Sequence, residues 1–283
     1  MIITSIVTGS AALKEFKLQL FTFEQWHKDA LPTFYIYTDD ETEPQIQSIQ
    51  YGGKIFTKQV LNRYKGLARN EMETKKGIIF PSIWSDLMCE KISCIRWAFK
   101  QEGEGCKGVF FMDGDITLLG RMPTIPEGVD VALSPHYIRK TDSDKYGYYN
   151  GGFGWLANPS FCDIWEEATM TSRFFEQAAL EEVAKAAKNL YIFPIQYNFG
   201  WWRMFQQAEQ TPDVVVKRFG FHRSPESCGI TFDGEPIGSI HSHFTNRIEH
   251  HNREFNGVII SKLSLLRSHK PANELLQYLR KNF

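Results

Sequence analysis

The chain has 283 residues and a formal net charge of −1, which excludes the strongly basic field that recruits nucleic acid. Hydrophobic residues make up 42% and charged residues 23%, the balance of an ordinary globular protein that can bury a large α/β core. No apolar run approaches the length of a membrane span, and the N-terminus lacks the charged and apolar regions of a signal peptide.

The first forty residues alternate between strand and helix patterns. Ile2–Val7 is a β-branched run that predicts a strand, and Thr8–Ser10 forms a turn at its carboxyl end. Apolar residues then recur at helical spacing, which predicts an amphipathic helix over about residues 11 to 30. Thr33–Thr38 predicts a second strand, which opens into Asp39-Asp40. Strand, helix, strand is the opening of a doubly wound sheet.

The next helix carries a lysine among its apolar residues. Residues 45 to 80 are polar and predict a solvated helix and loop, or alternatively a flap over a diphosphate. From Pro81 a helix follows in which Lys91 lies on the apolar stripe, four residues from Leu87. A lysine in this position either extends its ammonium to solvent at the edge of the core or reaches a ligand cleft.

Two aspartates follow the most apolar strand of the chain. Val109–Met112 predicts a buried central strand, and Asp113 and Asp115 come directly after it. Ligands of open α/β sheets bind beyond the carboxyl ends of strands, and a divalent cation would relieve the repulsion between two carboxylates this close. The segment therefore predicts a metal–phosphate site, with a simple polar turn as the alternative.

The second half of the chain continues the α/β pattern. Val129–Ser134 predicts a strand, and helices are expected at about 159–171 and 173–189. Tyr146–Trp155 is rich in glycine and aromatic rings, so its backbone can approach a ligand closely and its rings can stack on a sugar. The alternative is an aromatic strand with bulges.

The last segments contribute two histidines. Pro194–Gly200 is loop-like, and Asp213–Phe219 predicts a strand. In Pro236–Phe244 a period of two places His241 and His243 on one face of a further strand. A short terminal helix ends the chain.

Domain organisation and compartment follow from what the chain lacks. It contains no long linker, so we expect one domain over 1–283. The five cysteines form no metal-binding pair, which indicates reduced thiols and predicts a cytoplasmic protein.

Several of these segments, taken in order over about residues 1 to 245, resemble the GT-A glycosyltransferases, which carry an Asp-x-Asp motif at the end of a central strand. The matching pieces are Ile-Val-Thr-Gly-Ser at 6–10, Lys91, Val-Phe-Phe-Met-Asp-Gly-Asp-Ile at 109–116, Tyr-Asn-Gly-Gly-Phe at 149–153, Glu-Gln at 176–177, Pro-Ile-Gln-Tyr-Asn-Phe at 194–199 and His-Ser-His at 241–243. Position 176 is Glu where Asp is commoner, and no His-x-x-Gly-x-x-Lys-Pro-Trp ending is present. Retention and inversion of configuration therefore both stay open.

The resemblance implies a fold and an activity. The fold would be a Rossmann-like, mixed but mostly parallel sheet flanked by helices, with a donor half over 1–120 and an acceptor half over 121–283 that ends in a helical tail. The activity would be transfer of a sugar, hexosyl in type, from a nucleotide-diphospho-sugar (UDP- or GDP-linked) to a carbohydrate or other hydroxyl acceptor.

The resemblance also implies site residues. Mn²⁺ or Mg²⁺ would be held by Asp115 directly and by Asp113 through water, unless Asp113 holds the donor ribose instead. Of the two histidines, His243 is the favoured ligand and His241 the alternative. Glu176 and Gln177 would lie beside the oxocarbenium-like transition state, although a solvated first turn of a helix explains them equally well. Tyr37 would stack on the base of the donor. The residues that would bind the donor are Thr8, Gly9, Tyr37, Asp39, Lys91, Asp113, Asn150, Gly151 and Gly152.

Three other functions fit parts of the sequence. Asp113-Gly-Asp115-Ile-Thr117 also matches the nucleophile loop of haloacid-dehalogenase-type phosphatases, although that motif normally follows the first strand. A non-catalytic carbohydrate-binding protein would use the same aromatic cleft without chemistry. A nucleotidyltransferase would use a similar sheet to consume a nucleoside triphosphate.

Overall fold

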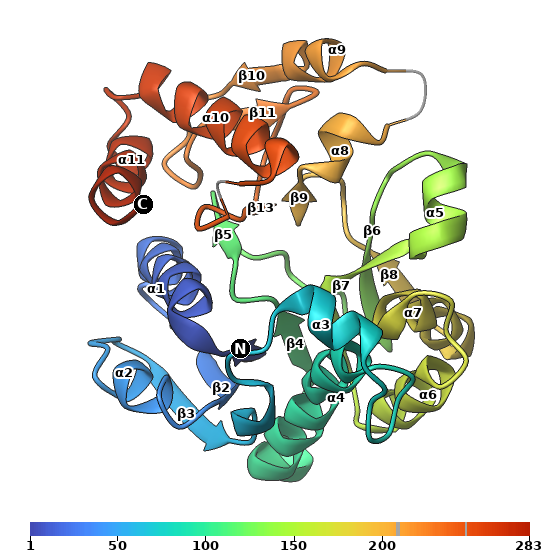
Figure 1. Ribbon diagram of the computed structural model, residues 1–283. Coiled ribbons are helices and arrows are strands. Elements are labelled where there is room, and N and C mark those ends of the chain that lie inside the picture. Colours follow the sequence, from blue (N-terminus) through green and yellow to red (C-terminus); the bar gives the residue numbers. More distant parts are fainter. Residues whose placement is uncertain (208–209, 247) are drawn as a thin grey trace.

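A seven-stranded sheet forms the centre of the molecule (Figure 1). The computed structural model describes residues 1–207, 210–246 and 248–283. The strand order is β3 (Lys54–Gln59), β2 (Thr33–Thr38), β1 (Ile2–Val7), β4 (Val109–Met112), β7 (Tyr149–Leu156), β6 (Val131–Pro135) and β8 (Leu190–Ile192). Neighbours are parallel except at β7, which runs antiparallel to both β4 and β6. The predicted mixed, mostly parallel sheet is confirmed.

The alternation of side chains along β4 explains why helices cover both faces of the sheet. Phe110 and Met112 pack in the core that contains α1 (Gly9–Trp26), whereas Val109 and Phe111 pack with α4 (Ile83–Glu102). The second face also receives α6 (Ser160–Thr169) and α7 (Phe175–Ala186). A strand buried on both faces must be apolar throughout, as β4 is.

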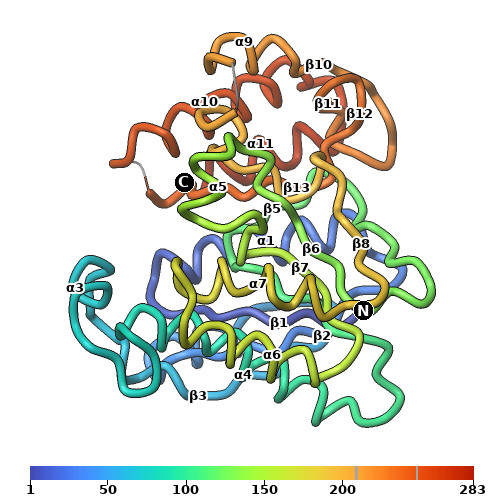
Figure 2. The backbone as a smooth tube through the Cα atoms, turned by 90° about the vertical axis from the view of Figure 1, so that its right-hand side faces the viewer, coloured from blue at the N-terminus to red at the C-terminus, as the bar shows by residue number. Residues whose placement is uncertain are grey.

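A second layer, formed mostly by the last third of the chain, lies against the carboxyl edge of the sheet (Figures 1 and 2). Its two small sheets have the orders β5 (Ile116–Leu118), β13 (Ser239–His241), β9 (Phe199–Gly200) and β10 (Phe219–Phe221), β11 (Ile230–Phe232), β12 (Glu235–Pro236). Helices α10 (His250–Leu265) and α11 (Lys270–Asn282) complete it. Because β13 pairs antiparallel with β5 and sets His241 opposite Ile116, the late histidines reach the central aspartates.

Several predicted elements differ from the structure. The strand predicted at Asp213–Phe219 is wrong: Pro212 begins α9 (Pro212–Lys217), and β10 starts only at Phe219. A proline in the first helical turn favours helix over the β-branched run that suggested a strand. The predicted strand Pro236–Phe244 is divided into β12 and β13, so His243 follows the strand. Residues 45–80, predicted as helix and loop, also contain edge strand β3.

The shorter helices are α2 (Glu43–Gln47), α3 (Arg69–Thr74), α5 (Lys140–Tyr146) and α8 (Trp202–Phe205), with 3₁₀ turns at Asn62–Tyr64 and Gly103–Gly105. The glycine- and ring-rich segment forms β7, the aromatic strand that was one of its two interpretations. Among the described residues, no helix combines the length and the apolar character needed to cross a bilayer.

Candidate active site

A cleft of about 550 Å³ at the carboxyl edge of the sheet gathers residues from distant parts of the chain. Most of the predicted site residues line it: Lys91, Asp113, Asn150, Gly151, Gly152, Glu176, Gln177, His241 and His243. Its wall also contains the aromatic side chains of Trp84, Tyr146, Phe174, Phe175, Trp201 and Trp202. Clefts of this size, with a few convergent polar groups among rings, are typical of small-molecule sites.

One side of the cleft is a compact cluster around Lys91. Its ammonium is 2.9 Å from Asp113 Oδ1 and 3.1 Å from Glu176 Oε1, and it donates to the Gly151 carbonyl at 3.0 Å. Burial disfavours the charged form, but the two carboxylates outweigh it and raise the pKa of Lys91. The lysine on the apolar stripe of α4 therefore points into the cleft, and its role in binding a donor stays a prediction.

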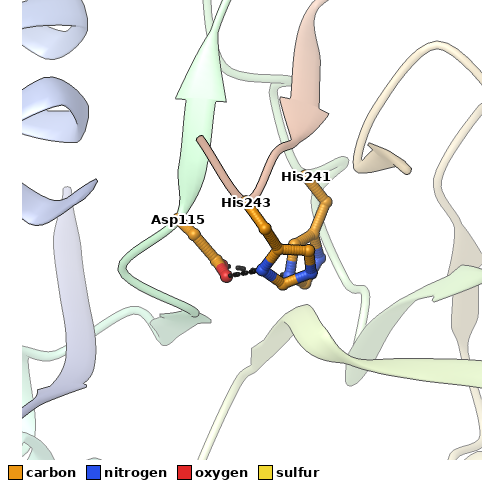
Figure 3. A group of neighbouring side chains, drawn as sticks. All are labelled: Asp115, His241 and His243. Atoms are coloured by element: carbon orange, nitrogen blue, oxygen red, sulfur yellow. Dashed lines mark ion pairs between the residues drawn. The ribbon is translucent and has the colours of Figure 1, made fainter. Parts of the chain in front are cut away.

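The other side of the cleft is lined by His241 and His243, which form a group with Asp115 (Figure 3). His243 Nδ1 lies 2.7 Å from Asp115 Oδ2, and His241 Nε2 lies 3.0 Å from Asp115 Oδ1. The potential ligand atoms of the three residues lie within 4.8 Å of one another. Burial would raise the pKa of the Asp115 carboxyl, but the two imidazoles hold it well below its ordinary value.

This group fits a divalent cation. Asp115 Oδ1 is buried and accepts no hydrogen bond within the described ranges, although His241 Nε2 faces it. Carboxylate oxygen and imidazole nitrogen are the ligands that Mn²⁺ accepts, and three of them converge here. Asp113 is not one of these three residues, and its Oδ1 pairs with Lys91; metal ligation by Asp113 stays a prediction.

The glycines of β7 let the two sides approach each other. A Cβ on Gly152 would lie 2.6 Å from the His241 ring and 2.7 Å from Asp113 Oδ2, and a Cβ on Gly151 would lie 2.8 Å from Glu176 Oε1. Contacts under 3 Å would force backbone or ligands apart. The glycines are therefore required where the strand passes between the Lys91 cluster and the histidines.

Gln177 is oriented by the same strand. Its Oε1 accepts from the Gly151 amide at 3.1 Å and from Asn150 Nδ2 at 3.4 Å, while its Nε2 donates to the Tyr146 carbonyl at 2.8 Å. Glu176 is 3% exposed, so it is not the solvated residue that the alternative interpretation required. The preceding Phe175 has φ 45°, a strained conformation for an aromatic residue that is typical of functional sites.

The residues predicted to bind the nucleotide form a separate group at the ends of β1 and β2. Asp39 Oδ2 accepts from Thr8 Oγ1 at 2.6 Å and from the Gly9 amide at 3.2 Å. Burial opposes the charge of Asp39, but hydrogen bonds from Thr8 and Thr42 outweigh it and lower the pKa of Asp39. These residues do not line the cleft, and their contact with a nucleotide stays a prediction.

Tyr37 lies away from these groups. The residue is 4% exposed. Its ring packs against Trp97 of α4, and its hydroxyl donates to the Ser93 carbonyl of the same helix. A ring in this position presents no free face, so the placement argues against the predicted base stacking. The side chains of one strand alternate between faces, and Tyr37 points towards α4.

Two contributors were missed by the sequence analysis. Asn198 was noted within the Pro-Ile-Gln-Tyr-Asn-Phe piece without a role, yet its Oδ1 lies 2.9 Å from His241 Nδ1. Glu15 is a buried carboxyl on α1 whose Oε1 accepts from Thr245, just after His243. Burial, with a contribution from the Asp115 charge, raises the pKa of Glu15 to about 8. Glu15, Gln19 and Thr22 form a buried polar row at helical spacing on α1, and the sequence offered no signal that this row would be buried.

The sheet order and the position of the aspartates after β4 define the fold as that of the GT-A glycosyltransferases. No family model matches the chain, and no curated protein matches it. The crystal structure of an active-site mutant of LgtC superposes with a TM-score of 0.53 at 13% identity, covering 92% of this chain and 96% of LgtC. The galactosyltransferase LgtC in complex with donor and acceptor sugar analogs gives 0.51 at 13% identity, covering 85% and 86%. At this identity the likeness concerns the fold.

Proposed function

We propose that this chain is a metal-dependent glycosyltransferase that moves a sugar from a nucleotide-diphospho-sugar to a hydroxyl acceptor. The proposal depends on one observation: His241 and His243, which form a group with Asp115, line the same cleft as the Lys91 cluster. The fold is shared with LgtC, a galactosyltransferase solved with donor and acceptor sugar analogs. A UDP- or GDP-sugar donor and a carbohydrate acceptor follow as the proposed substrates.

The two sides of the cleft would have different roles, one in binding the metal ion and the other in binding the sugar. A Mn²⁺ or Mg²⁺ ion held by Asp115, His241 and His243 would supply Lewis-acid stabilisation to a departing diphosphate. Lys91 holds Asp113 and Glu176 in fixed positions, where their free oxygens can accept hydrogen bonds from sugar hydroxyls. Gln177 presents its amide next to Gly151, where a carbonyl dipole can stabilise positive charge that develops on the sugar.

The aromatic wall would exclude water from the transferred sugar. Phe175 packs edge-on against Trp84, and Trp202 packs edge-on against the His241 ring. Removing water strengthens every electrostatic interaction in the cleft and suppresses hydrolysis of the donor.

The test is a thermal-shift screen of UDP-, GDP-, CMP- and dTDP-sugars with and without Mn²⁺, followed by transfer and donor-hydrolysis assays. We expect one nucleotide class to stabilise the protein only with the metal, by about 2.7 kcal/mol at a hundredfold excess over Kd. Stabilisation without turnover would instead favour a carbohydrate-binding protein. Phosphate release from a generic aryl phosphate would favour the phosphatase, whose motif would normally follow the first strand and not β4.

A further inference from the structure

Asn198 connects the two sides of the cleft through its side-chain amide. It is fully buried, precedes β9 and has φ 55°, a left-handed conformation that Asn tolerates. Its Oδ1 lies 2.9 Å from His241 Nδ1, and its Nδ2 donates to Asn150 Oδ1 at 2.9 Å and to Ser134 Oγ at 3.2 Å. One amide therefore contacts residues of β13, β7 and β6.

The orientation of this amide follows from backbone groups, because a backbone N–H can only donate and a backbone carbonyl can only accept a hydrogen bond. The Gly152 amide donates to Asn150 at 2.9 Å, so the accepting atom of Asn150 must be Oδ1. An oxygen at that position requires a donor from Asn198, so the NH₂ of Asn198 faces Asn150. The Asn198 oxygen then faces His241, and His241 Nδ1 must carry the hydrogen.

The other bonds of Asn150 agree with this assignment. Its Nδ2 faces Gln177 Oε1, which also accepts from the Gly151 amide. It also faces His136 Nε2 at 3.3 Å, and His136 donates from Nδ1 to the Gly147 carbonyl at 3.0 Å. Every amide and imidazole along the path from Gln177 to His241 thus has one allowed orientation.

We infer that Asn198 is a positioning residue that holds the proton of His241 on Nδ1 and so turns its Nε2 lone pair towards Asp115 and a bound cation. The inference rests on the proposed metal dependence of this site. With Nδ1–H donated to Asn198, a cation would bind Nε2 together with Asp115, whose Oδ1 lies 3.0 Å from that nitrogen. Hydrogen bonds of this kind fix the metal-binding tautomer of histidine in many metal sites. Through Asn150, the same amide sets the position of the metal ligand relative to Gln177.

The test compares two substitutions that both tolerate a left-handed backbone, Asn198→Gly and Asn198→Asp. Binding of Mn²⁺ alone is measured from the EPR signal of the free ion. Glycine removes the acceptor for His241, so we expect Mn²⁺ affinity to fall by about 10- to 100-fold. Aspartate keeps an acceptor for Nδ1–H but cannot donate to Asn150, so affinity should stay within about threefold of wild type while transfer falls. Ser134→Ala is the matched control: it removes one lateral partner of Asn198 and one acceptor of Arg203, which keeps its bond to the Pro135 carbonyl, and it should bind Mn²⁺ as wild type does.

Wild-type affinity in Asn198→Gly, or equal losses in the Gly and Asp variants, would overturn the inference and leave the metal site standing. Absence of saturable Mn²⁺ binding by the wild-type protein would instead contradict the proposed metal dependence, and the inference with it. A second measurement needs no Asn198 variant: ¹⁵N NMR of histidine in the wild-type protein with Mg²⁺, assigned with His241→Gln. We expect the His241 proton on Nδ1, and a proton on Nε2 would overturn the inference.

Discussion

Asp113 and Asp115 are separated by one glycine, yet their carboxylates have different partners. Asp113 pairs with Lys91, a cation that the protein itself supplies from α4. Asp115 faces two imidazoles, and its Oδ1 accepts no hydrogen bond from the described residues. Nearby Glu15 adds a second buried carboxyl to the Asp115 side, where no lysine or arginine of the described residues pairs with either one.

The difference indicates what each region is built to receive. In the Lys91 cluster one ammonium of the protein pairs with two carboxylates, whose remaining oxygens can accept hydrogen bonds from a polyhydroxylated group. The Asp115 side is negative and offers lone pairs, so it suits a cation. Each of the following substitutions changes one of the two sides, and the measurement shows whether the properties of the other side change as well.

The largest effect is expected from Asp115→Asn. The substitution removes the charge that would hold a cation and leaves the packing nearly unchanged, so transfer should fall by about 1,000-fold or more. Thermal unfolding in the absence of metal should show a loss of stability, because the imidazoles that lower the pKa of Asp115 stabilise its charged form in the folded state. Kinetics and Mn²⁺ binding measure the first expectation, and scanning calorimetry measures the second.

Asp113→Asn is the contrasting control for this experiment. It should weaken Mn²⁺ binding less than Asp115→Asn does, because one oxygen of Asp113 is paired with Lys91. If Asp115→Asn keeps wild-type turnover at saturating Mn²⁺, the assignment of the metal side is wrong.

The next effect separates the two histidines. His243→Ala and His241→Ala should each weaken Mn²⁺ binding by at least about tenfold, since each ring faces a different oxygen of Asp115. His241 is held by Asn198, whereas His243 is more exposed and follows the strand, so we expect the larger loss for His241. Isothermal titration with Mn²⁺ gives both values. Wild-type affinity in both variants would mean that a cation is held by the aspartates and the donor, without the histidines.

Lys91→Met tests the Lys91 side. Removing the ammonium leaves the buried Glu176 and the partly exposed Asp113 without their cation, so we expect a loss of about 3–5 kcal/mol in the free energy of unfolding. Urea denaturation measures the loss, and Glu176→Gln in the same background should restore part of it. Mn²⁺ affinity should change little. Equal stability of Lys91→Met and wild type would show that the ammonium can leave the cluster for solvent.

The fold was predictable where the signals are local. The β-branched run before Thr8, the helical spacing after it and the apolar run before Asp113 each specify an element from neighbouring residues alone. The strand predicted at Asp213–Phe219 was wrong because Pro212 and three consecutive valines give opposite local preferences, and the helix start prevailed.

The site was predictable only in part, since its contacts join distant segments. The residues near Asp115 could be named, but the sequence does not show that Lys91 meets Glu176 across 85 positions or that Asn198 meets His241 across 43. Tyr37 illustrates the limit: a residue at the end of β2 was placed correctly along the strand, while the face to which it points depends on the packing of α4.

The smallest effect concerns pH and returns to the surplus of acid beside Asp115. Burial and the Asp115 charge raise the pKa of Glu15 from 4.5 to about 8. The folded state therefore binds a proton that the unfolded state releases between these values, so this contribution to stability is complete below pH 4.5 and is lost as pH rises through about 8. Glu15→Gln keeps an oxygen that can accept from Thr245 and removes the titration. Urea denaturation in the presence of a chelator measures the effect. We expect the free energy of unfolding of the variant to equal that of wild type near about pH 5 and to exceed it near about pH 8.5. If the free energy of unfolding of the two proteins depends on pH in the same way, Glu15 stays ionised in the folded state and adds a second negative charge to the Asp115 side.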